Sequence, residues 1–266
     1  MRKESVEMTG SILFSKEEAI AFIKINRPAK LNALSSTMLN DMMKVLGEAE
    51  LDNQVRVIVI SGGEKNFCAG ADIDEEKGMT PSDALQFCLR GQKVCTAIQI
   101  SMKPVIAEIS GYALGGGLEL ALACDFRISS RESVFGFPEV TLGVTTGWGG
   151  AANLVKIVGA SKAKELLMVG KTVGAEEAYR LGIISEIVQP DQLTRAVSEF
   201  AKKLSSLPAS SVAMAKNLIN RYSELLSPKD LFLEAVGNAY CSSLEEKTKA
   251  YEAFLSRKKK AQKGKG

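Results

Sequence analysis

The sequence predicts an α/β fold in which a mostly parallel sheet carries crossover helices. Runs of β-branched and apolar residues alternate with segments of helical spacing from about residue 11 to residue 149. The densest run, at 55–60, stops at the glycine pair 62–63, which is typical of a buried strand that ends in a turn. Strands that alternate with helices favour parallel pairing, because a parallel connection needs a crossover.

The individual elements follow from the same patterns. A polar turn is expected at 15–18 between the first two strands, and Ser36 is the expected N-cap of the first helix. From Gly149 onward the pattern is mainly helical, with one short apolar run at 183–188. The other expected elements are strands at 11–14, 20–25, 104–109 and 126–129 and a helix over 82–100.

The composition is that of a soluble globular protein. Hydrophobic residues make up 45% of the 266 residues and charged residues 24%. No apolar run reaches the ~18 residues that a membrane span needs, and residues 1–7 do not read as the start of a signal peptide. The five cysteines form no C-x-x-C pair, which favours reduced thiols. We therefore expect a cytoplasmic protein that does not bind a membrane.

The net charge of +3 arises at the C-terminal end. Arg257 and five lysines lie within residues 257–266, which contain no acidic residue, and without them 28 basic residues face 31 acidic ones. The body of the protein is therefore not expected to bind nucleic acid. The tail alone could give weak, salt-sensitive RNA binding, and the alternative is a solvated, flexible end.

The chain contains no histidine. This excludes catalytic triads that use histidine, histidine metal sites and imidazole proton shuttles. Proton transfer must then depend on carboxylates, lysine, tyrosine, cysteine or water.

The first candidate site segment is 66–73, which follows the strand at 55–60. Its small residues Ala69, Gly70 and Ala71 allow close approach to the backbone and leave N–H groups accessible. Such a loop can donate an N–H group to an oxyanion. The alternative is a tight connection that needs small residues only for its own geometry.

The second segment, 110–120, contains three consecutive glycines at 115–117 before a predicted helix. A glycine-rich turn at a helix start exposes the first N–H groups and the positive end of the helix dipole. No lysine follows the glycines, so the segment is not a phosphate-binding P-loop. We expect an oxyanion site, because a packing role would rarely need all three glycines; a crowded contact between helix and sheet is the alternative.

Two glutamates lie in apolar surroundings beside these glycine-rich turns. Glu119 falls on the first turn of the predicted helix, and Glu139 follows Pro138 in an otherwise apolar loop. A desolvated carboxylate suits acid–base chemistry. Taken alone, Glu119 could instead be stabilised by the helix dipole and Glu139 could be structural, but together, in a chain without histidine, they indicate a carboxylate pair.

These segments together resemble the enoyl-CoA hydratase/isomerase (crotonase) family. The resemblance covers about residues 20–187, and its motifs in this chain are 26–34, 67–73, 111–119 and 135–139. It implies a spiral of repeated ββα units over 1–201, a C-terminal helical region over 202–256 that supports trimerisation, and a basic, flexible tail at 257–266. A homotrimer or a homohexamer, built as a dimer of trimers, is the implied assembly.

The resemblance also implies the reaction and its residues. The backbone N–H groups of Ala71 and Gly116 would form the oxyanion hole, Glu119 would activate the water that attacks C3, and Glu139 would protonate C2 of a 2-enoyl-CoA. Coenzyme A is then part of the substrate, no separate cofactor or metal is expected, and the role would lie in fatty-acid β-oxidation. The residues implied to contact the substrate or its coenzyme A moiety are Lys30, Leu31, Ala69, Asp72, Ile73 and Asp74.

Three departures from the family pattern leave the reaction and substrate open. Thr145 and Thr146 replace a common proline, Asp74 replaces a lysine near the coenzyme phosphates, and Leu118 replaces a frequent cysteine. The alternatives are an enoyl-CoA isomerase, or a hydratase or hydrolase for a cyclic acyl-CoA. An inactive family member is disfavoured, since both glutamates are present. For the basic tail, a further alternative is that it contacts the coenzyme A phosphates.

Overall fold

The computed structural model describes residues 10–222, 228–243 and 245–263, and its main sheet has six strands in the order β1-β2-β3-β4-β6-β9. Only β1 and β2 are antiparallel, and every other neighbouring pair in this sheet is parallel. The predicted α/β class is therefore confirmed. The strands are β1 (Ile12–Glu17), β2 (Ile20–Ile25), β3 (Val57–Ser61), β4 (Val105–Ile109), β6 (Phe126–Ser130) and β9 (Glu186–Val188).

Two local predictions differ from the structure. The polar residues 15–17 belong to strand β1 rather than to a turn, and the chain reverses at Glu18, whose φ is +54°. Ser35, not Ser36, is the N-cap of α1 (Ser36–Leu51), because the Ser35 hydroxyl accepts a hydrogen bond from the Met38 N–H group at 3.3 Å.

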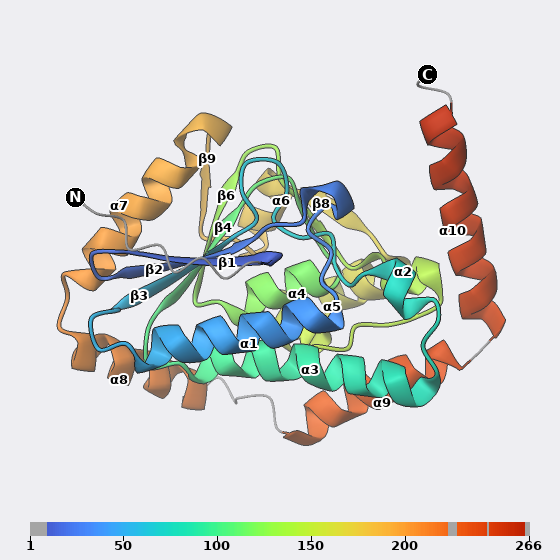
Figure 1. Cartoon of the computed structure of the whole chain (residues 1–266), viewed down its shortest axis with the longest axis horizontal. Helices are drawn as coiled ribbons and strands as arrows, with labels where there is room; N and C mark the ends of the chain where they lie inside the picture. Colours follow the sequence, from blue (N-terminus) through green and yellow to red (C-terminus); the bar gives the residue numbers. More distant parts are fainter. Residues whose placement is uncertain (1–9, 223–227, 244, 264–266) are drawn as a thin grey trace.

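The two faces of the main sheet are covered by different helices (Figure 1). Val57 and Val59 of β3 pack with the α7 helix (Leu193–Ser205), whereas Ile58 and Ile60 belong to the core beneath α1, α3 (Pro81–Ile100) and α4 (Gly116–Ala123). This alternation follows from the period of two along a strand. Because helices cover both faces of the sheet, residues 57–60 of β3 are apolar on both sides, which explains the continuous apolar run in the sequence.

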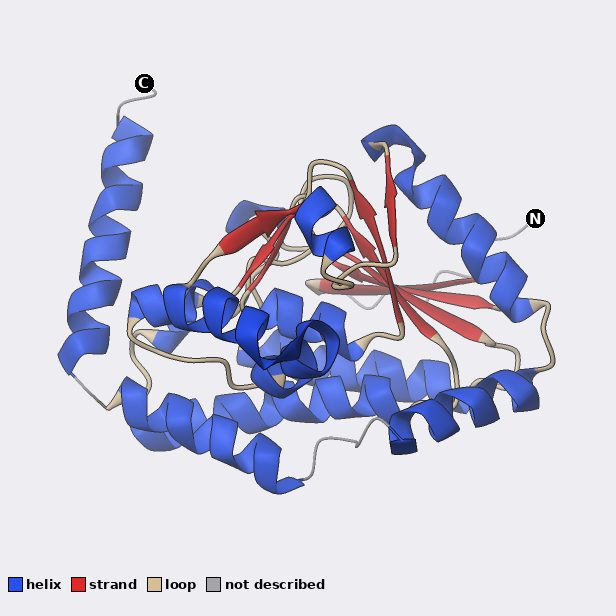
Figure 2. Cartoon of the chain, turned by 180° about the vertical axis from the view of Figure 1, so that it is seen from behind, coloured by secondary structure: helices blue, strands red, loops and turns tan. Residues whose placement is uncertain are grey.

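A second, three-stranded sheet lies beside the main one (Figure 2). Its strands are β5 (Tyr112–Leu114), β7 (Val134–Gly136) and β8 (Thr172–Gly174), and none was predicted. Three residues are too few to display an alternating pattern. The remaining elements before α7 are η1 (Pro28–Lys30), α2 (Ile73–Glu76), η2 (Pro138–Leu142), α5 (Gly150–Val169), α6 (Ala175–Arg180) and η3 (Pro190–Gln192).

Three helices complete the chain: α8 (Ala209–Tyr222), α9 (Pro228–Ser242) and α10 (Glu245–Lys263). Helix α9 lies along α3, while α10 contacts η2 and then extends away from the body (Figure 1). The predicted boundary between residues 201 and 202 lies inside α7, and the division into a core and a C-terminal helical region stays a prediction. Most of the predicted tail, 257–263, continues α10, and 264–266 lie outside the described residues. Among the described residues, no helix has the length and apolarity needed to cross a membrane.

Lys216 attaches α8 to the body through a largely buried ammonium group. Its Nζ donates to the carbonyl oxygens of Ile98 and Lys103 at 2.9 and 3.1 Å and to Oδ2 of Asp125 at 2.8 Å. Burial raises the pKa of Asp125, and the Lys216 charge opposes that rise. The pair is therefore costly to break, since removal of one partner leaves a buried, uncompensated charge.

We predict that Lys216→Met lowers the free energy of unfolding by about 3 kcal/mol, because it leaves the Asp125 carboxylate and two carbonyl groups without this donor. Urea unfolding followed by circular dichroism measures the effect. Lys164→Met, an exposed lysine of α5, is the matched control and should stay within about 0.5 kcal/mol. Equal stability of the two variants would contradict this assignment.

Candidate active site

The candidate site forms where the loops after β3 and β4 meet. Residues 66–68 run beside 110–114: the Phe67 N–H group donates to the Ser110 carbonyl at 2.7 Å, and Cys68 exchanges hydrogen bonds with Tyr112 and Leu114 at 2.8 and 3.0 Å. These segments follow neighbouring parallel strands, whose carboxyl ends lie at one edge of the sheet. Crevices at such edges are the usual ligand sites of open α/β sheets.

The two predicted oxyanion-hole residues lie on facing segments. Leu34 donates to the Gly70 carbonyl and accepts from the Asp72 N–H group, at 2.8 and 2.9 Å, so the intervening Ala71 N–H group points to the opposite side. Gly116 is the first residue of α4, whose leading N–H groups have no partner within the helix. Ala71 and Gly116 line the same cavity.

Each of the three consecutive glycines has its own steric reason. Gly115 has a φ of +52°, which favours glycine. A Cβ atom on Gly116 would lie 2.5 Å from the Trp148 ring, and one on Gly117 would lie 2.1 Å from the Cys68 carbonyl oxygen. The expectation that packing would rarely need all three glycines was therefore wrong: α4 starts in a crowded contact and still presents its first turn to the cavity.

Glu119 is 2% exposed and its carboxylate is held by backbone groups. Oε1 accepts hydrogen bonds from the N–H groups of Trp148 at 2.7 Å and Gly150 at 2.8 Å. Gly150 is the first residue of α5, where helix N–H groups are available to an anion, and Trp148 directly precedes the N-cap Gly149. A Cβ on Gly150 would lie 2.7 Å from Cγ of Glu119, so the glycine permits this approach.

Glu139 reaches the cavity from η2, and both of its carboxylate oxygens are shielded from solvent. A Cβ atom on Gly115 would lie 3.2 Å from its Oε1, which places this carboxylate against the glycine turn before α4. Glu119 and Glu139 line one cavity together with Ala71 and Gly116. The structure therefore brings the predicted carboxylate pair and the predicted N–H donors together.

The residues implied to bind coenzyme A divide into two groups. Ala69 and Ile73 line the cavity, and the Ala69 N–H group donates to the Leu31 carbonyl at 3.0 Å, which joins the 28–31 segment to the cavity wall. Leu31 itself is 42% exposed. Lys30 and Asp74 form an exposed ion pair with each other next to this wall.

Asp72 has a structural position instead. It is 6% exposed, its Oδ2 lies 2.6 Å from the Arg27 guanidinium, and its Oδ1 accepts from the Asp74 N–H group at 3.1 Å. Asp72 therefore caps α2 and attaches it to the segment after β2. The predicted contact of Asp72 with the substrate stays a prediction.

Sequence reasoning missed several residues that line the cavity, among them Glu76, Thr145, Trp148 and Asn238. Thr145 was noted only as a departure from a family pattern. Its carbonyl accepts from Nδ2 of Asn238 at 2.5 Å, which brings α9 to the site. Trp148 is the one tryptophan of the chain and sits between glycines, a signal that could have been used. Glu76 and Asn238 carry no comparable signal, because nothing nearby in the sequence shows which way they face.

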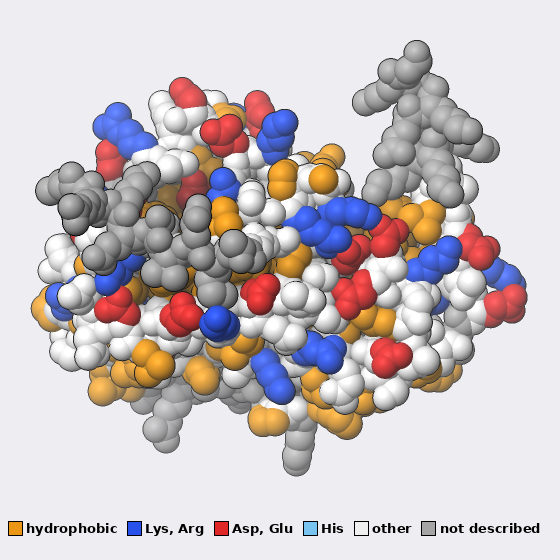
Figure 3. Space-filling model, in the orientation of Figure 1, with side chains coloured by type: hydrophobic (Ala, Val, Ile, Leu, Met, Phe, Trp, Pro, Cys, Tyr) orange, Lys and Arg blue, Asp and Glu red, His pale blue; other side chains and the backbone are white. Residues whose placement is uncertain are grey.

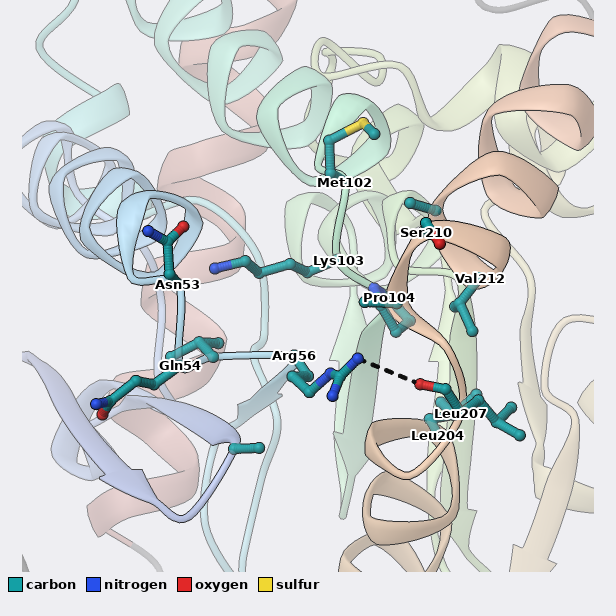
Figure 4. A pocket seen from close by; sticks show the side chains of 14 residues that line it. Asn53, Gln54, Arg56, Met102, Lys103, Pro104, Leu204, Leu207, Ser210 and Val212 are labelled. Atoms are coloured by element: carbon teal, nitrogen blue, oxygen red, sulfur yellow. Dashed lines mark hydrogen bonds between the residues drawn. The ribbon is translucent and has the colours of Figure 1, made fainter.

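A second cavity, of about 690 Å³, lies between the start of β3, the end of α3 and the connection from α7 to α8 (Figure 4). Arg56 donates to the Leu207 carbonyl at 3.5 Å across it, and Lys103 Nζ donates to the Asp52 carbonyl at 2.7 Å. The residues described around this cavity include none of the predicted site residues. The charged groups of Arg56 and Lys103 in this cavity donate hydrogen bonds to carbonyl oxygens of the chain itself.

Two glutamates with shielded carboxylates beside a glycine-rich helix start, on an α/β scaffold, are typical of acid–base enzymes. Comparison with known proteins gives the family: the model of the enoyl-CoA hydratase/isomerase family matches residues 15–265, and the chain belongs to this family. The predicted crotonase-like fold is thereby confirmed, whereas trimerisation stays a prediction.

Individual relatives agree. The chain is 39% identical over 250 residues to a short-chain-enoyl-CoA hydratase of Clostridium acetobutylicum, which covers 94% of this chain and 96% of the relative. It is 36% identical to a crotonyl-CoA hydratase of Syntrophomonas wolfei with the same coverage. The crystal structure of an enoyl-CoA hydratase from Mycobacterium avium subsp. paratuberculosis matches with a TM-score of 0.86 at 25% identity, over 93% of this chain and 96% of that one.

We predict opposite effects for two Gly→Ala substitutions. Gly117→Ala should destabilise the protein by about 1–3 kcal/mol, because its Cβ would collide with the Cys68 carbonyl. Gly47→Ala in α1, where nothing lies within 4 Å, should stabilise it by up to about 1 kcal/mol. Thermal unfolding of both variants provides the test, and a Gly117→Ala protein as stable as the wild type would refute the described contact.

Proposed function

We infer that the protein is an enoyl-CoA hydratase, a lyase that adds water reversibly across the C2=C3 double bond of a 2-enoyl-CoA. The observation that carries this inference is the convergence of Glu119 and Glu139 on the cavity lined by Ala71 and Gly116. A hydratase needs two carboxylates, one for the attacking water and one for the carbon that receives a proton. The hydratase names of the relatives support the same reaction.

In the proposed mechanism the thioester oxygen lies between the Ala71 and Gly116 N–H groups. Attack of water at C3 moves the electrons of the double bond toward this oxygen and forms an enolate. Each N–H donor in a preorganised hole is worth roughly 3–4 kcal/mol of transition-state stabilisation. The start of α4 adds the positive end of a helix dipole at the developing charge.

The two glutamates complete the proton balance. Glu119 accepts a proton from water while the water oxygen bonds to C3, and Glu139 donates a proton to C2 as the enolate collapses. The sum adds one water molecule and, after proton exchange between the carboxylates, restores the starting enzyme. The hydrogen bonds from Trp148 and Gly150 hold Glu119 in one orientation, which suits a group that must position water.

The proposed substrate is a short-chain enoyl-CoA such as crotonyl-CoA. The cavity has a volume of about 60 Å³, far below the ~300–1,000 Å³ of pockets that enclose drug-sized ligands. A four-carbon acyl group suits this space, and two relatives carry short-chain or crotonyl in their names. Fatty-acid β-oxidation as the pathway and the cytoplasm as the location are proposals that rest on the family resemblance and the reduced cysteines.

Self-association into trimers or hexamers is likewise proposed. Large apolar side chains are exposed along α8 and α9, and extensive exposed apolar surface is typical of interfaces. They are Met214, Leu218, Ile219, Phe232, Val236 and Tyr240. The RNA-binding alternative, which concerned the basic tail at 257–266, gains no support from the family match or the relatives. On the described part of the face in Figure 3, basic and acidic side chains are interspersed.

We predict that Glu119→Gln and Glu139→Gln each lower kcat for crotonyl-CoA hydration by about 100- to 10,000-fold, the usual contribution of acid–base catalysis. In Glu119→Gln the new side-chain amide would retain an oxygen that can accept from Trp148 and Gly150, so the local structure should persist. Loss of the enoyl-thioester absorbance measures the rate, and mass spectrometry identifies the hydrated product.

The exposed Glu132→Gln substitution is the matched control and should keep full activity. Trp148 lies at the cavity, so its fluorescence reports binding of butyryl-CoA without turnover. Both site variants should bind this analogue. Near-wild-type hydration by both variants would show that the assigned roles are wrong, and an isomerised product without water gain would favour the isomerase alternative.

A further prediction concerns the coenzyme A moiety. Lys30→Ala should raise KM for crotonyl-CoA about two- to fivefold, because exposed ion pairs contribute up to ~1 kcal/mol. The KM for crotonyl-pantetheine, which lacks the nucleotide phosphates, should change less. Asp74→Asn removes the partner that now occupies Lys30 and should not raise KM for crotonyl-CoA. An equal rise with both thioesters would exclude a phosphate contact for Lys30.

A further inference from the structure

One residue that lines the cavity belongs to a polar cluster that the proposed mechanism does not use. Glu76, at the end of α2, lines the cavity alongside the catalytic glutamates. Its Oε2 accepts a hydrogen bond from the Tyr251 hydroxyl at 2.9 Å, and its carbonyl oxygen accepts from Lys247 Nζ at 2.8 Å. Lys247 and Tyr251 both belong to α10, one helical turn apart.

The cluster is closed to solvent from the α10 side. Tyr251 is 0% and Lys247 4% exposed, and the Lys247 ammonium lies 5.3 Å from the centre of the Tyr251 ring. Burial raises the pKa of Glu76 and of the Tyr251 hydroxyl, and the charges of Glu76 and Glu139 add to the rise for Tyr251. The tyrosine therefore stays a hydrogen-bond donor at neutral pH.

The small cavity therefore contains a polar side chain that hydrogen bonds hold in place, rather than an apolar side chain that could move aside. Leu142 and Val144 supply apolar surface to the same cavity, and Glu76 lines it as well. Each buried methylene of an acyl chain normally gains about 0.8 kcal/mol. A chain that reached Glu76 would instead have to displace or desolvate a carboxylate that Tyr251 already holds, and burial of an unpaired polar group is unfavourable.

We propose that Glu76, fixed by Tyr251 and Lys247 of α10, is the residue that limits the acyl group to short chains. The proposal rests on the proposed hydratase function and deepens it, because it names the side chain that sets the substrate range. Helix α10 contributes to the site in two ways. It holds Glu76 through Tyr251 and Lys247, and it also contacts η2, the element that carries Glu139. Glu76 is a specificity residue in this account and takes no part in proton transfer to the substrate.

The test compares the kcat/KM values of crotonyl-CoA and 2-octenoyl-CoA. Glu76→Leu replaces the carboxylate by an apolar side chain that is one atom shorter, and it should raise the octenoyl-to-crotonyl ratio about tenfold, the lower end of the effect of pocket methylenes. Tyr251→Phe removes only the donor hydroxyl and should raise the ratio by a smaller factor. It also serves as the deciding variant if Glu76→Leu does not fold.

Glu75→Leu is the matched control. Glu75 precedes Glu76 in the same helix, but its Oε2 accepts from the Ser36 N–H group of α1 at 3.0 Å, on another side of α2. This variant should keep the wild-type ratio. Unchanged ratios in Glu76→Leu and Tyr251→Phe would overturn the proposal, as would a wild-type protein that hydrates both thioesters equally well.

Binding separates this proposal from the hydratase function. Trp148 fluorescence gives Kd values for butyryl-CoA and octanoyl-CoA, neither of which can be hydrated. A wild-type preference for butyryl-CoA that Glu76→Leu removes would support the role of Glu76 even if no enoyl-CoA were hydrated. Turnover of crotonyl-CoA without any change of the binding preference in Glu76→Leu would support the function and overturn the role of Glu76.

Discussion

The carboxylate of Glu119 accepts hydrogen bonds from the N–H groups of Trp148 and Gly150, and the geometry of the candidate site depends on this contact. It joins the first turn of α4 to the start of α5, so two helix starts converge on one cavity. The Trp148 ring lies where a side chain on Gly116 would be. A single buried carboxylate thus fixes the ring that shapes the cavity, and the absence of side chains at two glycines makes this possible.

The same constraint explains why the glycine turn can serve packing and chemistry together. Small residues at 115–117 let α4 approach the 66–71 loop and the Trp148 ring, and the same close approach brings the Ala71 and Gly116 N–H groups to one cavity. Crowding and accessibility of N–H groups are therefore not competing interpretations here. Because backbone groups supply the donors, the proposed oxyanion site needs no histidine and no other ionisable donor, which suits a chain without histidine.

Much of this could be predicted from the sequence, for physical reasons. The main-sheet strands other than β9 are long enough to show an apolar pattern, and Glu119 and Glu139 stand out as lone carboxylates in apolar segments. Strands of three residues, such as β5, carry no such signal. Glu76 belongs to a run of acidic residues in a four-residue helix, and only the tertiary fold turns it toward Tyr251, 175 positions away. Contacts of that kind depend on the packing of α10, which local patterns do not specify.

The most direct test of the central claim is the fate of crotonyl-CoA incubated with the purified protein in water labelled with heavy oxygen. We expect a 3-hydroxybutyryl-CoA product that carries the heavy oxygen, formed by the wild type and at least about 100-fold more slowly by Glu119→Gln. Recovery of unhydrated crotonyl-CoA, while Trp148 fluorescence shows that butyryl-CoA binds, would contradict the hydratase function. It would leave the fold and the cavity in place for another reaction of the family.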